Sequence, residues 1–317
     1  MKNKESKFQR VVYMGKEGVN IYSEDNRVID LLEGDFVPFI PEWRVEKHAG
    51  ANLSNLECHF GKKQEIKTDK NNNFFISGSF EEFFQAYTLP YFIHYILERE
   101  RAKKGKATIH AAAVSKKGKG ILILGKQGSG KTSITLELCK KYGYSLVGND
   151  LVLTGLQKDT GYLYGGTKIF RIRATTIKDY NKDLEKFFKM NSNDEWTRIA
   201  IIRPNEIQIM AEKSVVPVQA IYYVHLYPPG HNFIVKEVDK LFSRVYLYQI
   251  FSEYIRGSAI IPLIGKDLKF SDYIPPLDTR DAFAKRIKFI NWVINNKNYK
   301  YIAGELAGIC NFIDKNL

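Results

Sequence analysis

Residues 125–132 are the part of the sequence whose residue types and spacing are best suited to chemistry. Glycines adopt backbone angles that are closed to other residues, so successive N–H groups in a glycine-rich segment can converge on phosphate oxygens. Where a glycine and four further residues precede Gly-Lys-Thr, the lysine reaches the β- and γ-phosphates of a nucleotide and the threonine hydroxyl binds Mg²⁺. The sequence therefore predicts a P-loop for ATP and Mg²⁺, formed by Gly125, Lys126, Gln127, Gly128, Ser129, Gly130, Lys131 and Thr132.

The segments on either side of this P-loop fit a strand–loop–helix unit. Residues 120–124 form a continuous apolar run, which is typical of a strand buried on both faces. Residues 133–141 place Ile134, Leu138 and Cys139 at helical spacing. An accidental glycine-rich turn is the alternative, but a position between an apolar strand and a helix is the context that a true P-loop requires. We therefore expect the start of this helix to direct its positive dipole end at bound phosphate.

Two polar residues outside the loop are candidates for catalysis and metal binding. Asp150 follows an apolar strand about twenty residues after the loop, where P-loop enzymes place a carboxylate that orients Mg²⁺. Since aspartate is also common in turns, a capping role is the alternative. His110 lies within an apolar segment, and without further information a histidine in that setting is read as a buried core residue.

Three arginines are candidates for holding phosphate or an acidic group of a substrate. Arg171 and Arg173 alternate around Ile172, so on a strand both side chains would point to one face. Such a pair could clamp phosphate, or it could be the solvated face of an ordinary charged strand. Arg256, which follows a predicted aromatic helix at residues 246–254, is a weaker candidate of the same kind.

The remaining pattern predicts an α/β protein with a smaller, β-rich N-terminal domain. Short segments rich in β-branched and aromatic residues predict strands at residues 11–14, 19–22, 36–40 and 74–77. A helix at about residues 81–104 follows, and its apolar spacing suggests packing onto the next domain. A charged turn then indicates a boundary between domains at residues 1–104 and 105–317. In the second domain, strands are predicted at residues 108–114, 120–124, 144–147, 151–153 and 218–226, and helices at 133–141, 241–255 and 281–294.

The composition is that of an ordinary globular protein. Hydrophobic residues make up 44% of the 317 residues and charged residues 26%, which argues against global disorder. No apolar run is long enough to span a bilayer, and the charged N-terminus lacks a secretion signal. The three cysteines are odd in number and far apart, which fits neither a disulfide framework nor a zinc site. We therefore expect a cytoplasmic protein that does not bind membranes.

Positive charge is concentrated in the part of the chain that holds the P-loop. Residues 1–100 contain 13 Lys and Arg against 16 Asp and Glu, whereas residues 101–317 contain 35 against 19. A field of this kind attracts anions, including ATP, a phosphorylated substrate, an acidic peptide or nucleic acid. Charge alone does not choose among them.

Three runs of the sequence carry a likeness to a known family. They are Ile-His-Ala-Ala-Ala at residues 109–113, the apolar strand with the P-loop at 120–132, and Leu-Val-Gly-Asn-Asp-Leu at 146–151. Together they resemble the C-terminal kinase domain of HPr kinase/phosphorylase and its stand-alone relatives, some of which phosphorylate a serine on a peptide. The match is specific over about residues 107–155 and weaker out to about residue 260. It implies a P-loop kinase fold with His110 and Asp150 beside the transferring phosphate.

The resemblance also places Asn149 where the family has the first aspartate of an acidic pair, the presumed general base. A carboxamide cannot accept a proton at neutral pH, so Asn149 could orient a hydroxyl but not deprotonate it. Three explanations remain open: Asp150 or His110 takes the proton, the reaction needs no strong base, or the chain has lost catalysis. Because phosphoryl transfer depends largely on positioning and charge neutralisation, a kinase without a strong base is chemically sound. Phosphorylase activity would depend more on the acidic pair and is not expected here.

The main functional hypothesis is an ATP-dependent, HPr-kinase-like phosphotransferase whose catalytic site contains Lys131, Asp150, His110 and Asn149. Thr132 and Asp150 would hold Mg²⁺. The acceptor would be a hydroxyl of a peptide, a protein or a small molecule, and analogy favours a serine of a peptide or protein. The alternatives are a catalytically silent ATP-binding module, motivated by Asn149, and a phosphotransferase or binder directed at nucleic acid, motivated by the basic half. The sequence leaves a homo-oligomer open.

Overall fold

The computed structural model is a mixed α/β structure in two compact units, and it describes residues 8–48, 50–61, 65–69, 73–79, 88–174, 182–188, 198–255 and 277–317. The first unit comprises Met1–Ala107 and Phe251–Arg286, and the second comprises Thr108–Ile250 and Ile287–Leu317. The domain boundary after residue 104 stays a prediction, and the structure groups Phe251–Arg286 with the first unit. None of the helices within the described ranges combines the length and the hydropathy that crossing a bilayer requires.

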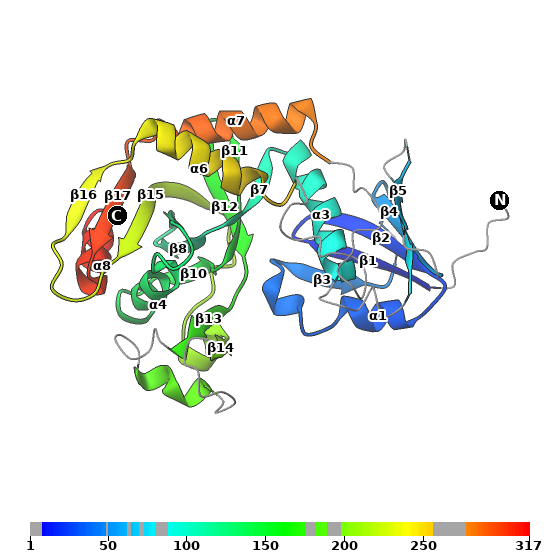
Figure 1. Ribbon diagram of the computed structural model, residues 1–317, viewed down its shortest axis with the longest axis horizontal. Helices are drawn as coiled ribbons and strands as arrows, with labels where there is room; N and C mark the ends of the chain where they lie inside the picture. The colour runs from blue at the N-terminus through cyan, green and yellow to red at the C-terminus, as the bar shows by residue number, and fades with distance from the viewer. Residues whose placement is uncertain are drawn as a thin grey trace. The chain divides into compact units, whose positions relative to one another are not determined.

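Over its described residues, the first unit is built on a six-stranded sheet. Its elements are β1 (Phe8–Met14), β2 (Glu17–Ser23), α1 (Arg27–Leu32), η1 (Val37–Phe39), β3 (Trp43–Glu46), β4 (Ser54–Phe60), β5 (Glu65–Thr68), β6 (Phe74–Gly78) and α3 (Thr88–Lys103). The strands lie in the order β3-β1-β2-β4-β6-β5. β4 is parallel to both β2 and β6, and the remaining pairs are antiparallel. Figure 1 shows α1 and α3 beside the sheet.

Three of the four strands expected in the first unit form as β1, β2 and β6. The fourth expectation is wrong, because Val37–Phe39 is the 3₁₀ turn η1 rather than a strand. Pro38 lies in the first turn of η1, where its fixed φ angle and missing N–H are tolerated. α3 buries Phe92, Ile93 and Ile96 in the core of its own unit. The helical spacing that suggested packing onto the next domain therefore reports packing within the first unit.

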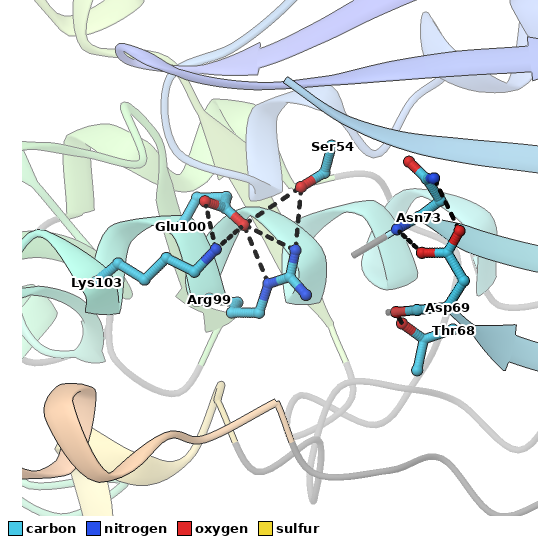
Figure 2. A network of polar contacts seen from close by, with 7 residues as sticks. All are labelled: Ser54, Thr68, Asp69, Asn73, Arg99, Glu100 and Lys103. Carbon is cyan, nitrogen blue, oxygen red and sulfur yellow. Dashed lines mark hydrogen bonds and ion pairs between the residues drawn. The ribbon is translucent and has the colours of Figure 1, made fainter. Parts of the chain in front are cut away.

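Polar contacts fix α3 on the sheet of the first unit. The guanidinium of Arg99 donates to the hydroxyl of Ser54, at the start of β4, over 3.0 Å, and to the carboxylate of Glu100 over 2.8 Å (Figure 2). Lys103 donates to both oxygens of the same carboxylate at 2.9 and 3.0 Å. Because Arg99 is almost fully buried, these bonds satisfy a cation that would otherwise be costly to desolvate.

The second unit contains a nine-stranded sheet and a two-stranded ribbon within the described part of the chain. The strands of the large sheet are β7 (Lys106–His110), β8 (Ala112–Lys116), β9 (Lys119–Leu124), β10 (Ser145–Gly148), β11 (Leu151–Gln157), β12 (Thr160–Gly166), β15 (Val216–Leu226), β16 (Ile234–Glu237) and β17 (Tyr299–Gly304). The ribbon pairs β13 (Phe170–Arg173) with β14 (Ile199–Ile202). The helices described after β7 are α4 (Lys131–Lys141), α6 (Lys240–Ser252), α7 (Arg280–Ile294), whose first seven residues are grouped with the first unit, and α8 (Leu306–Lys315). The 3₁₀ turns are η3 (Lys182–Phe187) and η4 (Pro204–Ile207).

The order of strands in the large sheet puts β9 next to β15. The path runs β10-β8-β9-β15-β12-β11-β7, and β17 pairs with β15 and β16. β9, β15 and β17 are parallel to one another, so their carboxyl ends meet at one edge of the sheet. In open α/β sheets, ligands bind at the carboxyl ends of the parallel strands. This edge is therefore where a site is expected.

β15 is buried because helices cover both faces of the sheet at this strand. Tyr222 packs against Phe312 of α8, with ring centroids 6.1 Å apart. The next residue, Tyr223, packs against Phe242 and Tyr246 of α6 at 5.4 and 5.1 Å. Since successive side chains of a strand point to opposite faces, α8 and α6 cover opposite faces of the sheet. α4 shares an apolar cluster with α8 and so lies on the same face (Figure 1).

The end of β10 passes very close to β12. A Cβ atom at Gly148 would lie 2.8 Å from Cα of Gly166, which is closer than real Cβ atoms come, and 3.0 Å from the carbonyl oxygen of Leu151. The two glycines therefore allow β10 to turn into β11 against β12. Asn149 and Asp150 form that turn.

This close approach predicts that Gly148→Ala destabilises the second unit. The added methyl group has to displace backbone atoms, and overpacking of this kind costs about 1–3 kcal/mol. Gly308→Ala in α8 is the matched control, because its Cβ would meet Phe233 at an ordinary 3.6 Å and alanine is the better helix former. Urea unfolding followed by fluorescence should show a lower midpoint for Gly148→Ala and an equal or higher midpoint for Gly308→Ala. Equal midpoints for Gly148→Ala and the unmodified protein would contradict this account of the turn.

Candidate functional site

The glycine-rich loop, residues 125–130, joins β9 to α4 at the carboxyl edge of the large sheet. Gly125, Gly128 and Gly130 have φ angles of +155°, +79° and +90°, a region that other residues rarely adopt. Gly130 is the N-cap of α4 and has no side chain with which to cap the helix. The first N–H groups of α4, which have no partners within the helix, therefore stay available to an anion.

Two of these glycines also let β15 run close to the loop. A Cβ at Gly125 would lie 2.9 Å from the carbonyl oxygen of Val224, and a Cβ at Gly130 would lie 2.9 Å from Cδ2 of Leu226. The N–H of Leu226 donates to the carbonyl oxygen of Ser129 at 2.9 Å. The end of β15 therefore fixes the loop from one side.

Two tyrosines hold the beginning of the loop. The hydroxyl of Tyr246 in α6 accepts a bond from the N–H of Gly125 and donates to its carbonyl oxygen, both at 3.1 Å. The hydroxyl of Tyr223 in β15 accepts a bond from the N–H of Lys126. The sequence offered no signal for these roles, because the tyrosines lie far along the chain and their spacing fits ordinary core packing.

Lys131, the first residue of α4, directs its side chain back into the loop. It is only 7% exposed, and its ammonium group donates to the carbonyl oxygens of Gly125 and Lys126 at 2.8 and 3.1 Å. Burial lowers the pKa of Lys131 to about 8, and the negative charge of Asp150 opposes this shift. The loop therefore contains a cation whose hydrogen bonds in this state come from neutral carbonyl groups. An anion would be a stronger partner.

The turn that carries Asp150 is held by backbone bonds. The N–H of Asn149 donates to the carbonyl oxygen of Thr167 at 3.0 Å, and the hydroxyl of Thr167 donates to the carbonyl oxygen of Asn149. The N–H of Ala111, between β7 and β8, donates to the carbonyl oxygen of Asp150 at 3.1 Å. Asp150 itself has a φ of +71°, which costs energy for a residue with a side chain and is often found at functional sites.

Lys131 lies within electrostatic range of two other predicted catalytic residues, His110 and Asp150. Burial raises the pKa of Asp150, and the positive charges of Lys131 and Arg171 oppose the rise. Burial lowers the pKa of His110, at the end of β7, to about 4, and Lys131 adds to this shift. His110 is therefore neutral at pH 7 and can accept a hydrogen bond. Lys131 thus acts electrostatically on both His110 and Asp150, and Arg171 acts on Asp150.

The side chain of Asn149 has no exposed area, whereas the neighbouring Asp150 is half-buried. Its amide donates to the carbonyl oxygen of Ile169 at 3.2 Å, and its Oδ1 has no hydrogen-bond partner among the described residues. In this arrangement the Asn149 side chain holds the turn in place. It supports the position of Asp150 and does not reach solvent.

The other residues singled out from the sequence lie as follows. Thr132 is half-buried in the first turn of α4. Arg171 is exposed and Arg173 half-buried on either side of the buried Ile172 in β13. Arg256 lies outside the described residues. The part of the chain that the structure describes contains no group of three or more His, Cys, Asp or Glu side chains able to hold a metal ion.

Comparisons with known proteins leave the function to be argued from this geometry. No protein-family model matches the chain, and no curated protein matches it. Among solved structures, it is similar to the Hpr(Ser) kinase/phosphatase from Coxiella burnetii, with 15% sequence identity over 41% of this chain and 77% of that chain. The TM-score is 0.22, and a likeness at this level carries no argument about fold or activity.

The buried amide of Asn149 predicts that Asn149→Asp destabilises the protein. A carboxylate cannot donate to the carbonyl of Ile169, and an unpaired charge at a site without exposed area costs about 3 kcal/mol or more at pH 7. Burial raises the pKa of the new carboxyl above its unfolded value, so the folded state holds the proton more tightly. The loss of stability is therefore absent below about pH 4 and grows as the pH rises from there to the raised pKa.

Thermal unfolding at about pH 4 and at about pH 7.5 measures this difference, because the unfolded aspartate titrates near about pH 3.9. Asn205→Asp, at an exposed position in η4, is the control and should unfold with the unmodified protein at both values. A variant Asn149→Asp that is as stable as the unmodified protein at pH 7.5 would show that the amide is not needed as a donor.

Proposed function

We propose that the chain is an ATP-dependent kinase with a P-loop domain of the HPr-kinase type, which transfers the γ-phosphate of ATP to a hydroxyl group. The observation that carries the proposal is the buried ammonium of Lys131, held in a glycine-rich loop at a helix start beside Asp150 and His110. The favoured acceptor is a serine of a peptide or protein. This choice rests on the sequence resemblance of residues 107–155.

The loop fits the polyphosphate of a nucleotide on three grounds. Its glycines adopt the left-handed angles that let N–H groups converge. The start of α4 lacks a side-chain cap at Gly130, which leaves its N–H groups and dipole for an anion. The hydroxyl of Ser129 is buried and has no hydrogen-bond partner among the described residues, as expected of a group whose partner is an oxygen of a bound ligand. Mg²⁺, bound by Thr132 and Asp150, would neutralise charge on the phosphates.

The side chains around the loop support transfer to a hydroxyl. Lys131 would leave the loop carbonyls and neutralise the transferring phosphoryl group. The acceptor oxygen forms a bond to the γ-phosphorus, the bond to the bridging oxygen breaks, and ADP leaves. The hydroxyl proton would go to His110, which is neutral at pH 7 and, unlike Asp150, is not assigned to Mg²⁺.

The ribbon of β13 and β14 supports a peptide as the acceptor. Arg171 lies directly opposite Ile201, and Arg173 opposite Ile199, so the four side chains share one face. Ile199 and Ile201 are 37% and 49% exposed, whereas the residues of the other face are buried. Arg171 is also within electrostatic range of Asp150. A face with both cations and exposed isoleucines beside the catalytic groups suits a peptide with acidic and apolar residues.

Lys131→Ala should abolish phosphoryl transfer, because it removes the cation that neutralises the transferring group. We expect a loss of at least about a thousandfold, the size of effect seen when a charge-stabilising group is removed from such a site. Lys141→Ala is the matched control in the same helix, since Lys141 is exposed and pairs with Glu137 at 2.8 Å. The assay is label transfer from γ-labelled ATP to serine-containing candidate peptides.

The outcomes of this assay distinguish an active kinase from a protein whose loop has no catalytic role and from a silent ATP-binding module. Transfer by the unmodified protein and by Lys141→Ala, with none by Lys131→Ala, supports the kinase. Normal transfer by Lys131→Ala refutes the role of the loop. ATP binding by the unmodified protein without transfer to any peptide, free hydroxyl compound or water identifies a catalytically silent module.

The lowered pKa of Lys131 predicts that ATP binding takes up a proton at high pH. Near pH 7 the free protein already carries the charge, whereas well above pH 8 Lys131 is mostly neutral and regains its proton when phosphate binds. Uptake should therefore approach about one proton at pH 9, and the affinity should fall as the pH rises above 8. Isothermal titration in buffers of different ionisation enthalpy measures this uptake. The same uptake by Lys131→Ala would assign the proton to another group.

A further inference from the structure

The glycine-rich loop has different chemistry on its two sides. β9, which ends in the loop, lies between β8 and β15 in the sheet. On the β8 side are His110 and Asp150. Ala111, which follows His110, donates its N–H to the carbonyl oxygen of Asp150 just before β8 begins. On the β15 side the chain continues into residues 227–233. A nucleotide whose terminal phosphate is directed to Asp150 has its base at the opposite end of the molecule. The β15 side of the loop can therefore receive the base.

Three aromatic rings gather on that second side. The rings of His225 and Tyr227 have centroids 4.8 Å apart, and those of Tyr227 and His231 are stacked at 5.4 Å with an angle of 26° between their planes. We call these three residues the ring stack. Both histidines are exposed, so the arrangement does not serve to bury apolar surface. Ordinary core packing, which accounts for most aromatic residues of this chain, does not account for it.

Contacts connect the ring stack to the glycine-rich loop. Tyr223, whose hydroxyl accepts the N–H of Lys126, stacks on Tyr301 with centroids 6.1 Å apart. Tyr301 in turn shares a hydrogen bond with the hydroxyl of Tyr227. On the other side, Leu226, which precedes Tyr227, donates its N–H to the loop. The ring stack and the loop are thus parts of one packed arrangement.

The segment that carries the ring stack is held in place. The N–H of Tyr227 donates to the carbonyl oxygen of Gly304 at 2.8 Å, and the N–H of Gly230 donates to the carboxylate of Glu305 at 2.5 Å. His231 Nδ1 lies 2.9 Å from the carbonyl oxygen of Pro228. Because a carbonyl oxygen can only accept, this bond fixes the orientation of the imidazole ring. A platform that is ordered before binding loses less entropy when a ligand stacks on it.

We propose that the ring stack of His225, Tyr227 and His231 is the site that receives the base of the nucleotide. The inference rests on the proposed function, since it requires phosphate in the glycine-rich loop. The base adds to the stack through its face, and aromatic stacking tolerates any purine because every base offers a π-face. The ligand class is therefore a nucleoside triphosphate, bound without strong preference between adenine and guanine.

The test compares three probes, MgATP, MgGTP and magnesium tripolyphosphate, by isothermal titration. The double variant His225→Ala, His231→Ala removes the two exposed rings, and substitutions at exposed positions have little effect on folding. We expect it to bind MgATP and MgGTP about tenfold more weakly than the unmodified protein, with unchanged binding of tripolyphosphate. His59→Ala, at an exposed histidine of β4 in the first unit, is the matched control and should leave all three affinities unchanged.

The outcomes separate the inference from the function on which it rests. If the double variant binds both nucleotides as the unmodified protein does, while tripolyphosphate also binds, the ring stack is not the base site and the phosphate loop stands. If the unmodified protein binds none of the three probes, the proposed function and the inference both fail. If the double variant loses the same affinity for tripolyphosphate as for the nucleotides, the histidines bind the phosphates, and the inference is overturned.

Discussion

The burial of one ammonium group in a loop of backbone amides and carbonyls is the constraint on which the rest of the site depends. Lys131 is nearly inaccessible to water, and its hydrogen bonds go to Gly125 and Lys126, two members of its own loop. Burial of a cation is costly unless it is paired, and neutral carbonyls are weaker partners than an anion. Left-handed glycines, two tyrosine hydroxyls and the end of β15 hold this arrangement open for a better partner. Under the proposed function, Lys131 would exchange these carbonyl partners for phosphate oxygens.

A second constraint acts at the turn after β10. The contact between Gly148 and Gly166 brings β10 against β12, and Thr167 binds the backbone of Asn149 from both sides. Asp150 is left in a left-handed conformation, half-buried and within electrostatic range of Lys131. The position of the carboxylate is therefore set by backbone packing, and Asn149, whose amide is buried in that packing, contributes to the position rather than to proton transfer.

The features that follow from a contiguous sequence pattern were predicted, whereas contacts between residues far apart in the chain were not. The strand, glycine-rich loop and helix around residues 125–132 follow from a contiguous pattern, as does the turn that carries Asp150. Tyr246 touches Gly125 although 121 positions separate the two residues, and no pattern of spacing encodes such a contact. Val37–Phe39 was misread as a strand, because β-branched and aromatic residues outweighed the proline between them. The grouping of the described residues 251–255 and 277–286 with the first unit likewise depends on tertiary contacts and leaves no local signal in the sequence.

The most direct measurement of the central claim is a crystal structure with Mg²⁺ and a non-hydrolysable ATP analogue. The account predicts that the polyphosphate lies along the amides of residues 125–132, and that the ammonium of Lys131 leaves the carbonyl oxygens of Gly125 and Lys126 for phosphate oxygens. A complex in which the nucleotide binds elsewhere while Lys131 keeps both carbonyl partners would contradict it.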